Sequence, residues 1–238
     1  MFDFSNRVVV VAGASGNLGQ AITRAFGAAG ANLVLLDRAP DRLPQLFPEL
    51  SGSPDHLLLG SVDVGSTESV ERAVHSTLER FGRIDVLANA VGGYRAGTPV
   101  HETPLDTWDL MLNLNARTAF VLSRAVVPHM LAQGSGKIVH VAARAALAGS
   151  AKAAAYSASK AATVRLVESL AAELRQANIN VNCVLPGTID TPQNRQSMPK
   201  GDHSRWVPPE AIADVILFLA SDAARAVNGA AVPVYGQS

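Results

Sequence analysis

Short apolar runs rich in β-branched residues alternate with longer segments of helical periodicity along nearly the whole chain. Parallel strands buried on both faces read as continuous apolar runs, and each needs a crossover connection, usually a helix, to reach the next. We expect strands at 7–12, 32–36, 57–62, 84–88, 137–142, 180–185 and 231–235, and helices at 18–29, 67–81, 105–133, 156–176 and 209–220. This order predicts an α/β protein in which a seven-stranded parallel sheet carries helices on both faces.

Length and charge narrow the classes of function. The chain has 238 residues, of which 48% are hydrophobic, so it fits one large domain or two small ones with a sizeable core. Lys plus Arg and Asp plus Glu both number 20. Without a basic excess we expect no nucleic-acid partner and no polybasic membrane surface. The N-terminus does not resemble a signal peptide and no apolar run could span a bilayer, so a cytoplasmic location is the expectation.

The cysteine and histidine content argues against disulfides and metal. Cys183 is the single cysteine and lies in an apolar run, which predicts a buried, inert thiol. The six histidines show no spacing typical of metal ligands. We therefore expect no metal site.

A glycine-rich turn joins the first strand to the first helix. Glycine permits a tight bend and close approach of a ligand, and the first N–H groups of a helix favour a pyrophosphate. A plain tight connection is the alternative, but the position at the first strand–helix junction favours a phosphate site. The candidate cofactor contacts in this turn are Gly13, Ser15, Gly16, Asn17, Leu18 and Gly19.

Acidic residues end the next two strands. Asp37 follows the second strand, where a carboxylate can bind ribose hydroxyls and repel a 2′-phosphate, which favours NAD(H). The neighbouring Arg38 could instead hold that phosphate, so NADP(H) is the alternative. Asp63 and Val64 end the third strand, where an adenine edge would lie, although Asp63 could simply cap the following helix.

A tyrosine and a lysine are spaced for acid–base chemistry. Tyr156 and Lys160 are four residues apart in an Ala-rich helix and therefore share one helical face. An ammonium near a phenol favours the phenolate, so we expect Lys160 to lower the pKa of Tyr156 towards neutrality. On its own, such a pair is as readily explained by a packed Tyr beside a solvated Lys.

Taken with the other motifs, the chain resembles the short-chain dehydrogenase/reductase family over almost its whole length. The resemblance implies a doubly wound, Rossmann-like fold, a single NAD(P)-binding domain over 1–238, a small-molecule substrate and a homotetramer or homodimer. The small residues of the Ala-rich helix allow close helix contacts, either within the fold or across a two-fold subunit interface. The matching residues are the glycine turn, Asp63-Val64, Asn89-Ala90-Val91-Gly92, Asn115, Tyr156 with Lys160, the run from Pro186 through Gly187, Thr188, Ile189, Asp190 and Thr191 to Pro192, and Phe218-Leu219-Ala220-Ser221-Asp222.

The resemblance also assigns roles to residues. In the family the Tyr transfers the proton, the Lys tunes it and binds the nicotinamide ribose, and an Asn supports a proton-relay water. Tyr156, Lys160 and Asn115 would be these catalytic residues, although Asn115 could instead be a buried, helix-kinking Asn. Asn89 would buttress the sheet beside the cofactor. The other cofactor contacts would be Ala90, Val91, Gly92, Pro186, Gly187, Thr188, Ile189 and Thr191.

Two positions depart from the family pattern. Asn17 occupies the usual middle glycine of the turn, and Asn tolerates left-handed backbone well. Ala143 occupies the position of a Ser whose hydroxyl donates to the carbonyl oxygen, a loss that typically costs about 3–4 kcal/mol of transition-state stabilisation. The chain could be a carbonyl reductase or alcohol dehydrogenase with a replaced donor, an idle dinucleotide-binding protein, or an enzyme whose substrate spreads the charge over a conjugated ring.

The third possibility has its own resemblance. The dihydropteridine reductases of this family similarly carry Ala at the Ser position, and the segment around 190–208 looks like their substrate lid. We therefore predict an NAD(P)(H)-dependent oxidoreductase, with NAD(H) preferred, whose substrate could be a conjugated ring such as a quinonoid dihydropterin. A carbonyl or alcohol substrate is the alternative. Tyr94 and Trp206 could stack on the flat ring of a conjugated substrate beside Ala143, or could serve only in core or lid packing.

Overall fold

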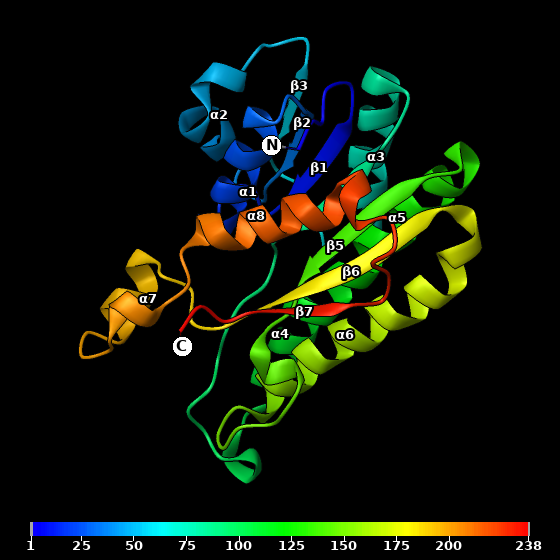
Figure 1. Cartoon of the computed structure of the whole chain (residues 1–238). Helices are drawn as coiled ribbons and strands as arrows, with labels where there is room; N and C mark the ends of the chain where they lie inside the picture. The colour runs from blue at the N-terminus through cyan, green and yellow to red at the C-terminus, as the bar shows by residue number, and fades with distance from the viewer. Residues whose placement is uncertain (1, 238) are drawn as a thin grey trace.

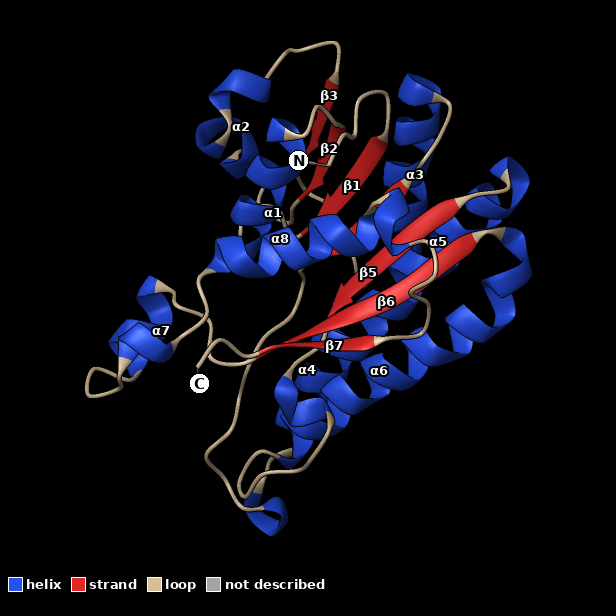
Figure 2. Ribbon diagram, in the orientation of Figure 1, coloured by secondary structure: helices blue, strands red, loops and turns tan. Residues whose placement is uncertain are grey.

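Seven parallel strands form one sheet in the computed structural model, which describes residues 2–237 (Figure 1). Their order across the sheet is β3-β2-β1-β4-β5-β6-β7. The expected seven-stranded parallel sheet is therefore confirmed, and Figure 2 shows the twisted sheet between two layers of helices. The strands are β1 Val8–Ala12, β2 Asn32–Leu36, β3 His56–Leu59, β4 Val86–Asn89, β5 Gly136–Val141, β6 Ile179–Pro186 and β7 Ala231–Val234.

Helices cover both faces of this sheet. Helices α1 and α8 pack on one face, and α3, α5 and α6 pack on the other (Figure 1). The long helices are α1 Asn17–Ala28, α3 Thr67–Phe81, α5 Thr118–Gln133, α6 Ala154–Leu174 and α8 Pro209–Ala220. Three short helices complete the fold: α2 Arg42–Leu46, α4 Leu105–Met111 and α7 Pro192–Ser197.

The central strands show why the apolar runs are continuous. All five residues of β1 are buried, and successive side chains of a strand point to opposite faces. Val8 and Val10 accordingly pack into the core under α3, α5 and α6, whereas Val9 and Val11 pack into the core under α1 and α8. A polar residue at any of these positions would face a helix rather than water.

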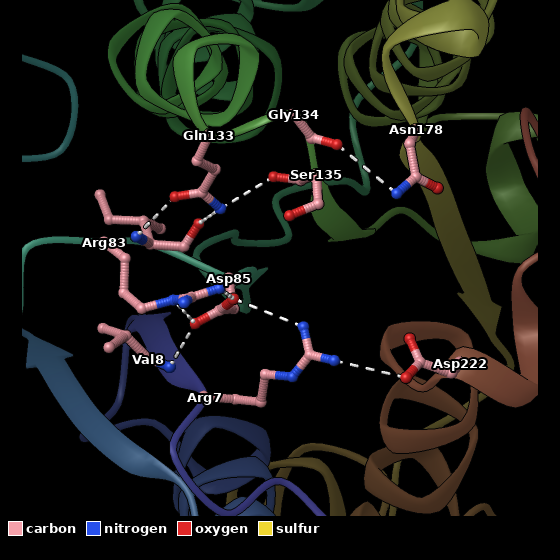
Figure 3. A network of polar contacts seen from close by, with 10 residues as sticks. Arg7, Val8, Arg83, Asp85, Gln133, Gly134, Ser135, Asn178 and Asp222 are labelled. Atoms are coloured by element: carbon pink, nitrogen blue, oxygen red, sulfur yellow. Dashed lines mark hydrogen bonds and ion pairs between the residues drawn. The ribbon is translucent and has the colours of Figure 1, made fainter.

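A buried carboxylate ties the strands together at the amino-terminal edge of the sheet (Figure 3). Asp85 accepts hydrogen bonds from Val8 N at 2.8 Å and from Arg83 Nε at 2.9 Å, and lies 3.5 Å from Arg7 Nη1. Pairing of this kind offsets the cost of burying a charge. The network fixes where β1 and β4 begin, and so aligns the carboxyl ends of these two strands with each other.

The structure differs from the expected elements most clearly in four places. Strand β3 ends at Leu59, three residues earlier than expected, and the short helix α2 was not expected. The expected helix 105–133 contains a π-helical segment, Leu112–Arg117, between α4 and α5. The segment 190–208 carries α7 rather than being irregular throughout. No helix among the described residues combines the length and hydrophobicity needed to cross a bilayer.

Candidate active site

The predicted cofactor segments meet where the strand order reverses, between β1 and β4. Ligands of doubly wound sheets bind at the carboxyl ends of the strands at this point. The N–H of Ala90, just after β4, donates to Ala12 O at the end of β1, at 3.0 Å. A Cβ on Gly13 would lie 3.0 Å from Val91 Cγ2, so only glycine fits there without displacing the second loop. The glycine turn and the 89–92 loop therefore form one surface.

The glycine turn leaves the start of α1 open to an anion. Gly13 has φ +75°, and a Cβ on Gly19 would lie 2.0 Å from Gly13 O. Helix α1 has no side-chain cap at Gly16 and no acidic residue in its first turn. Its first N–H groups and its positive dipole end are thus available to a pyrophosphate. The uncapped helix start fits a dinucleotide on physical grounds.

Asn17 does not use the left-handed backbone that we expected it to tolerate. It is the first residue of α1, and it is not among the described residues with positive φ. Its side chain instead projects to the lid, where Nδ2 donates to Gln193 Oε1 at 2.7 Å. The Asn therefore provides a contact that glycine could not make.

Asp37 and Asp63, the acidic residues after β2 and β3, each accept a hydrogen bond from a backbone N–H two residues later. Asp37 is half-buried after β2, and its Oδ1 accepts from Ala39 N at 2.9 Å, which fixes the carboxylate at the edge of the site. Arg38 is exposed. The side chain of Asp63 accepts from Gly65 N at 2.9 Å, and the cap of α3 is Ser66, so the alternative role of Asp63 as that helix's cap is wrong.

The π-helical segment directs Asn115 into the site. Its Oδ1 accepts from Gly93 N at 3.0 Å, and its Nδ2 donates to Ser159 Oγ at 2.9 Å and to Gly93 O at 3.2 Å. Ser159 Oγ in turn donates to Tyr156 O at 2.7 Å. π-Helical turns often occur at functional sites because they change the direction of one side chain. Asn115 thus lies where the helix departs from regular α-helical geometry, and its side chain links the 89–93 loop to α6.

Lys160 is a buried cation at the same place. It is 5% exposed, and its Nζ donates to Val141 O at 2.9 Å. Burial lowers its pKa to about 8. A Cβ on Gly92 would lie 3.0 Å from Lys160 Nζ and 2.9 Å from Asn115 Oδ1. The absence of a side chain at Gly92 therefore lets the backbone approach both residues.

The expected effect of Lys160 on Tyr156 is not observed, and that prediction is wrong for this structure. Burial raises the pKa of Tyr156 to about 12, with a further contribution from the nearby phenol of Tyr94. The spacing of the two residues indicates a neighbouring ammonium, but it does not reveal that burial removes the phenol from water. Tyr94 itself is 71% exposed and meets Tyr156 edge-on, with ring centroids 4.8 Å apart.

The lid is anchored at both ends. Asp190 N donates to Val207 O at 2.8 Å, Val207 N donates to Thr188 O at 2.9 Å, and Ile189 pairs with Val207 in an isolated β-bridge. The side chain of Thr191 caps α7 by accepting from Asn194 N at 3.1 Å. The end of the lid therefore lies beside the residues that follow β6, and α7 is held away from the sheet, as Figure 1 shows.

The remaining predicted residues lie around this site. Ala143 is buried just beyond β5 in extended backbone. Gly187 N donates to Val234 O at 3.1 Å, which holds the 186–191 run against β7. Trp206 lies in the lid, with its ring 4.4 Å from that of His203, and its stacking on a substrate ring stays a prediction.

Two contacts of the site lay outside the sequence reasoning. The role of Ser159 follows from its place three residues after Tyr156, a spacing that the helix makes adjacent. Gln193 carries no comparable signal, because its partner lies 176 residues away in the chain.

Comparisons with known proteins agree with this geometry. The family model for short chain dehydrogenases matches residues 7–201. The 2-(R)-hydroxypropyl-CoM dehydrogenase of Xanthobacter autotrophicus is 35% identical, covering 97% of this chain and 98% of its own. The NAD-dependent glycerol dehydrogenase of Listeria innocua is 32% identical, covering 96% and 92%. The crystal structure of gox2181 superposes with a TM-score of 0.92 at 32% identity, covering 98% of this chain and 96% of that one.

Proposed function

Since this chain belongs to the short-chain dehydrogenase family and is an NAD(P)-dependent oxidoreductase, we propose that its reaction takes place where Tyr156, Lys160 and Asn115 converge. Tyr156 is the acid–base residue in this proposal, Lys160 binds the nicotinamide ribose, and Asn115 supports the proton relay. A bound nicotinamide dinucleotide supplies the hydride chemistry.

The observation that carries this proposal is the buried ammonium of Lys160. Among the described residues it is in no ion pair with a carboxylate, and its hydrogen bond to Val141 O uses one of three donors. Burying such a cation is costly, and its pKa is lowered to about 8 as a result. A group kept there at that cost, beside a loop that is open for lack of side chains, fits a ligand rich in hydroxyl groups such as a ribose.

The pKa of Tyr156 bears on the direction of the reaction. With the pKa raised to about 12, the phenol holds its proton at neutral pH and can serve as a proton donor. Donation is what a reduction requires, because the substrate atom next to the hydride acceptor gains negative charge. Tyr156 is therefore in the protonation state from which a reduction starts.

NAD(H) is the proposed cofactor. The carboxylate of Asp37, fixed by Ala39 N, suits ribose hydroxyls and opposes a 2′-phosphate. The NAD-dependent relative from Listeria innocua supports the same choice. NADP(H) is the alternative because the exposed guanidinium of Arg38 adjoins this position.

Ala143 supports a conjugated substrate. At this buried position the side chain has no hydroxyl to donate to an oxyanion. A ring that delocalises the developing charge, such as a quinonoid dihydropterin, depends less on that donor. The exposed ring of Tyr94, edge-on to Tyr156, offers a surface on which such a ring can pack.

A carbonyl or secondary alcohol substrate is the second candidate, and the names of the two relatives favour it. The test is the rate of NADH oxidation, followed by absorbance, with quinonoid dihydropterin and with a panel of ketones and quinones. The conjugated-substrate proposal expects turnover of the ring compounds, and no gain on ketones for Ala143→Ser. A marked gain on ketones would favour the second candidate, and absence of turnover with every compound would favour an idle dinucleotide-binding protein.

We also propose that the chain assembles as a homotetramer or homodimer. Large apolar side chains on α4 and α5 remain exposed, with Leu105 at 78%, Phe120 at 54% and Leu131 at 48%. Exposed large apolar side chains along these two helices are available for contact with a second subunit. Light scattering of the purified protein tests this, and a monomer at micromolar concentration would contradict it.

A further inference from the structure

A chain of three buried polar side chains runs through the fold behind the 89–93 loop. Asn89 ends β4, His140 lies beside it in register on β5, and Ser123 lies on α5. Asn89 Nδ2 is 3.1 Å from His140 Nδ1, and Ser123 Oγ is 2.9 Å from His140 Nε2. All three residues are at most 2% exposed. The proposed reaction gives no role to this histidine.

The contacts of Asn89 determine which ring nitrogen carries the proton. Its Oδ1 accepts from Val91 N at 3.0 Å, so the amide NH₂ must be the group that faces His140. That group can only donate, and the Nδ1 of His140 must accept. The proton of the neutral ring is then on Nε2 and is donated to Ser123 Oγ. Ser123, whose hydroxyl can accept a hydrogen bond, accommodates the tautomer that Asn89 imposes.

The environment keeps this ring neutral. Burial lowers the pKa of His140 to about 4, and the positive charge of Lys160 acts in the same direction. An imidazolium would carry a proton on both nitrogens and would oppose the NH₂ of Asn89.

Asn89 connects the buried chain of polar side chains to the candidate site. By accepting from Val91 N it fixes the start of the loop whose next residues, Gly92 and Gly93, touch the site. Gly93 exchanges two hydrogen bonds with Asn115, and Gly92 leaves room for the Nζ of Lys160. Lys160 also donates to Val141 O, which follows His140 in β5. The ring therefore lies directly behind both supports of the site.

We propose that His140 is a positioning residue which, as the Nε2–H tautomer held by Ser123, orients Asn89 and so holds the 91–93 loop against Asn115 and Lys160. This inference rests on the proposed nucleotide site, because the loop is part of that site. It assigns His140 an effect on nucleotide binding beyond its effect on stability.

The test compares two substitutions that remove the same ring. In His140→Asn the amide oxygen can occupy the place of Nδ1 and still accept from Asn89, whereas His140→Leu leaves the Asn89 NH₂ without an acceptor. We expect His140→Leu to weaken NADH binding by about tenfold and to raise the KM for the nucleotide, and His140→Asn to stay within about threefold of the parent. Fluorescence titration of NADH and thermal unfolding are measured on each variant.

Thr77→Val is the matched control. Thr77 is buried in α3, and its Oγ1 donates to Ala73 O at 2.7 Å, so the variant also loses a buried hydrogen bond but leaves the site untouched. We expect it to bind NADH like the parent. Equal NADH affinity for His140→Leu and Thr77→Val would overturn the inference while the proposed function stands. Failure of the parent itself to bind NADH would overturn the proposed function.

A second measurement uses the parent protein alone. Nitrogen NMR of histidine-labelled parent protein near neutral pH distinguishes the two neutral tautomers and the imidazolium. The inference expects a His140 ring protonated on Nε2 alone. A proton on Nδ1 in the folded protein would contradict it whatever the variants do.

Discussion

Replacing Lys160 by Met should make the protein more stable near neutral pH while removing its activity. Met keeps an apolar stem of similar length but has no charge to bury. In the parent, burial lowers the pKa of Lys160 from 10.5 to about 8, which corresponds to about 3 kcal/mol of destabilisation when the group is charged in both states. The hydrogen bond to Val141 O recovers on the order of 1–2 kcal/mol. We therefore expect a net gain of about 1–2 kcal/mol for Lys160→Met near neutral pH.

The pH dependence provides the sharper test. Between the folded pKa of about 8 and the unfolded value of 10.5, the unfolded chain binds the proton that the folded protein has released. Stability of the parent therefore rises with pH through this interval, and the penalty is fully present below it. The variant lacks this group. The free energy of unfolding of the parent should therefore rise by about 2–3 kcal/mol relative to that of the variant between about pH 7 and pH 10.

Denaturant unfolding of both proteins across this pH range measures the difference. Other groups titrate in parent and variant alike, so their contributions largely cancel when the two free energies of unfolding are subtracted. If the difference stays constant with pH, or if Lys160→Met is strongly destabilised near neutral pH, then Lys160 is not the strained, buried cation on which the functional proposal depends.

Three further outcomes test separate parts of the site. Asp37→Ala should relax cofactor choice towards NADPH, as read from the ratio of NADH and NADPH dissociation constants; equal affinities in the parent would show that Asp37 does not discriminate. Asn17→Gly and Gln193→Ala should each speed NADH release by about two- to tenfold in stopped-flow measurements, and the double variant should add nothing to either single change. Fully additive effects would mean that the 2.7 Å contact does not hold the lid, and Gln196→Ala on the same short helix is the control. Tyr94→Phe should keep turnover near the parent if its ring only packs against the substrate, and a loss of about tenfold or more would assign a role to its hydroxyl.

The layers and the sheet could be predicted from sequence because both faces of the central strands are buried. A run such as Val8–Ala12 has no polar position that would permit another arrangement. The glycine turn and the spacing of Tyr156 and Lys160 could also be found from sequence, because each depends only on residues close together in the chain.

The parts that escaped prediction depend on distant contacts or on burial. The π-helical segment forms where Asn115 reaches Gly93, 22 residues away. The direction of the Tyr156 pKa depends on burial, which spacing does not reveal. Helix α7 is different, because Thr191 followed by Pro192 is a readable start signal for a helix that the sequence argument passed over.

The most direct test of the central claim is the comparison of turnover and NADH affinity in Tyr156→Phe. The phenyl ring keeps the packing against Tyr94 and removes only the proton that the reaction needs. We expect turnover to fall by on the order of a hundredfold or more while the NADH dissociation constant stays within about threefold of the parent value. Turnover equal to that of the parent would contradict the account, because the proton would then come from elsewhere.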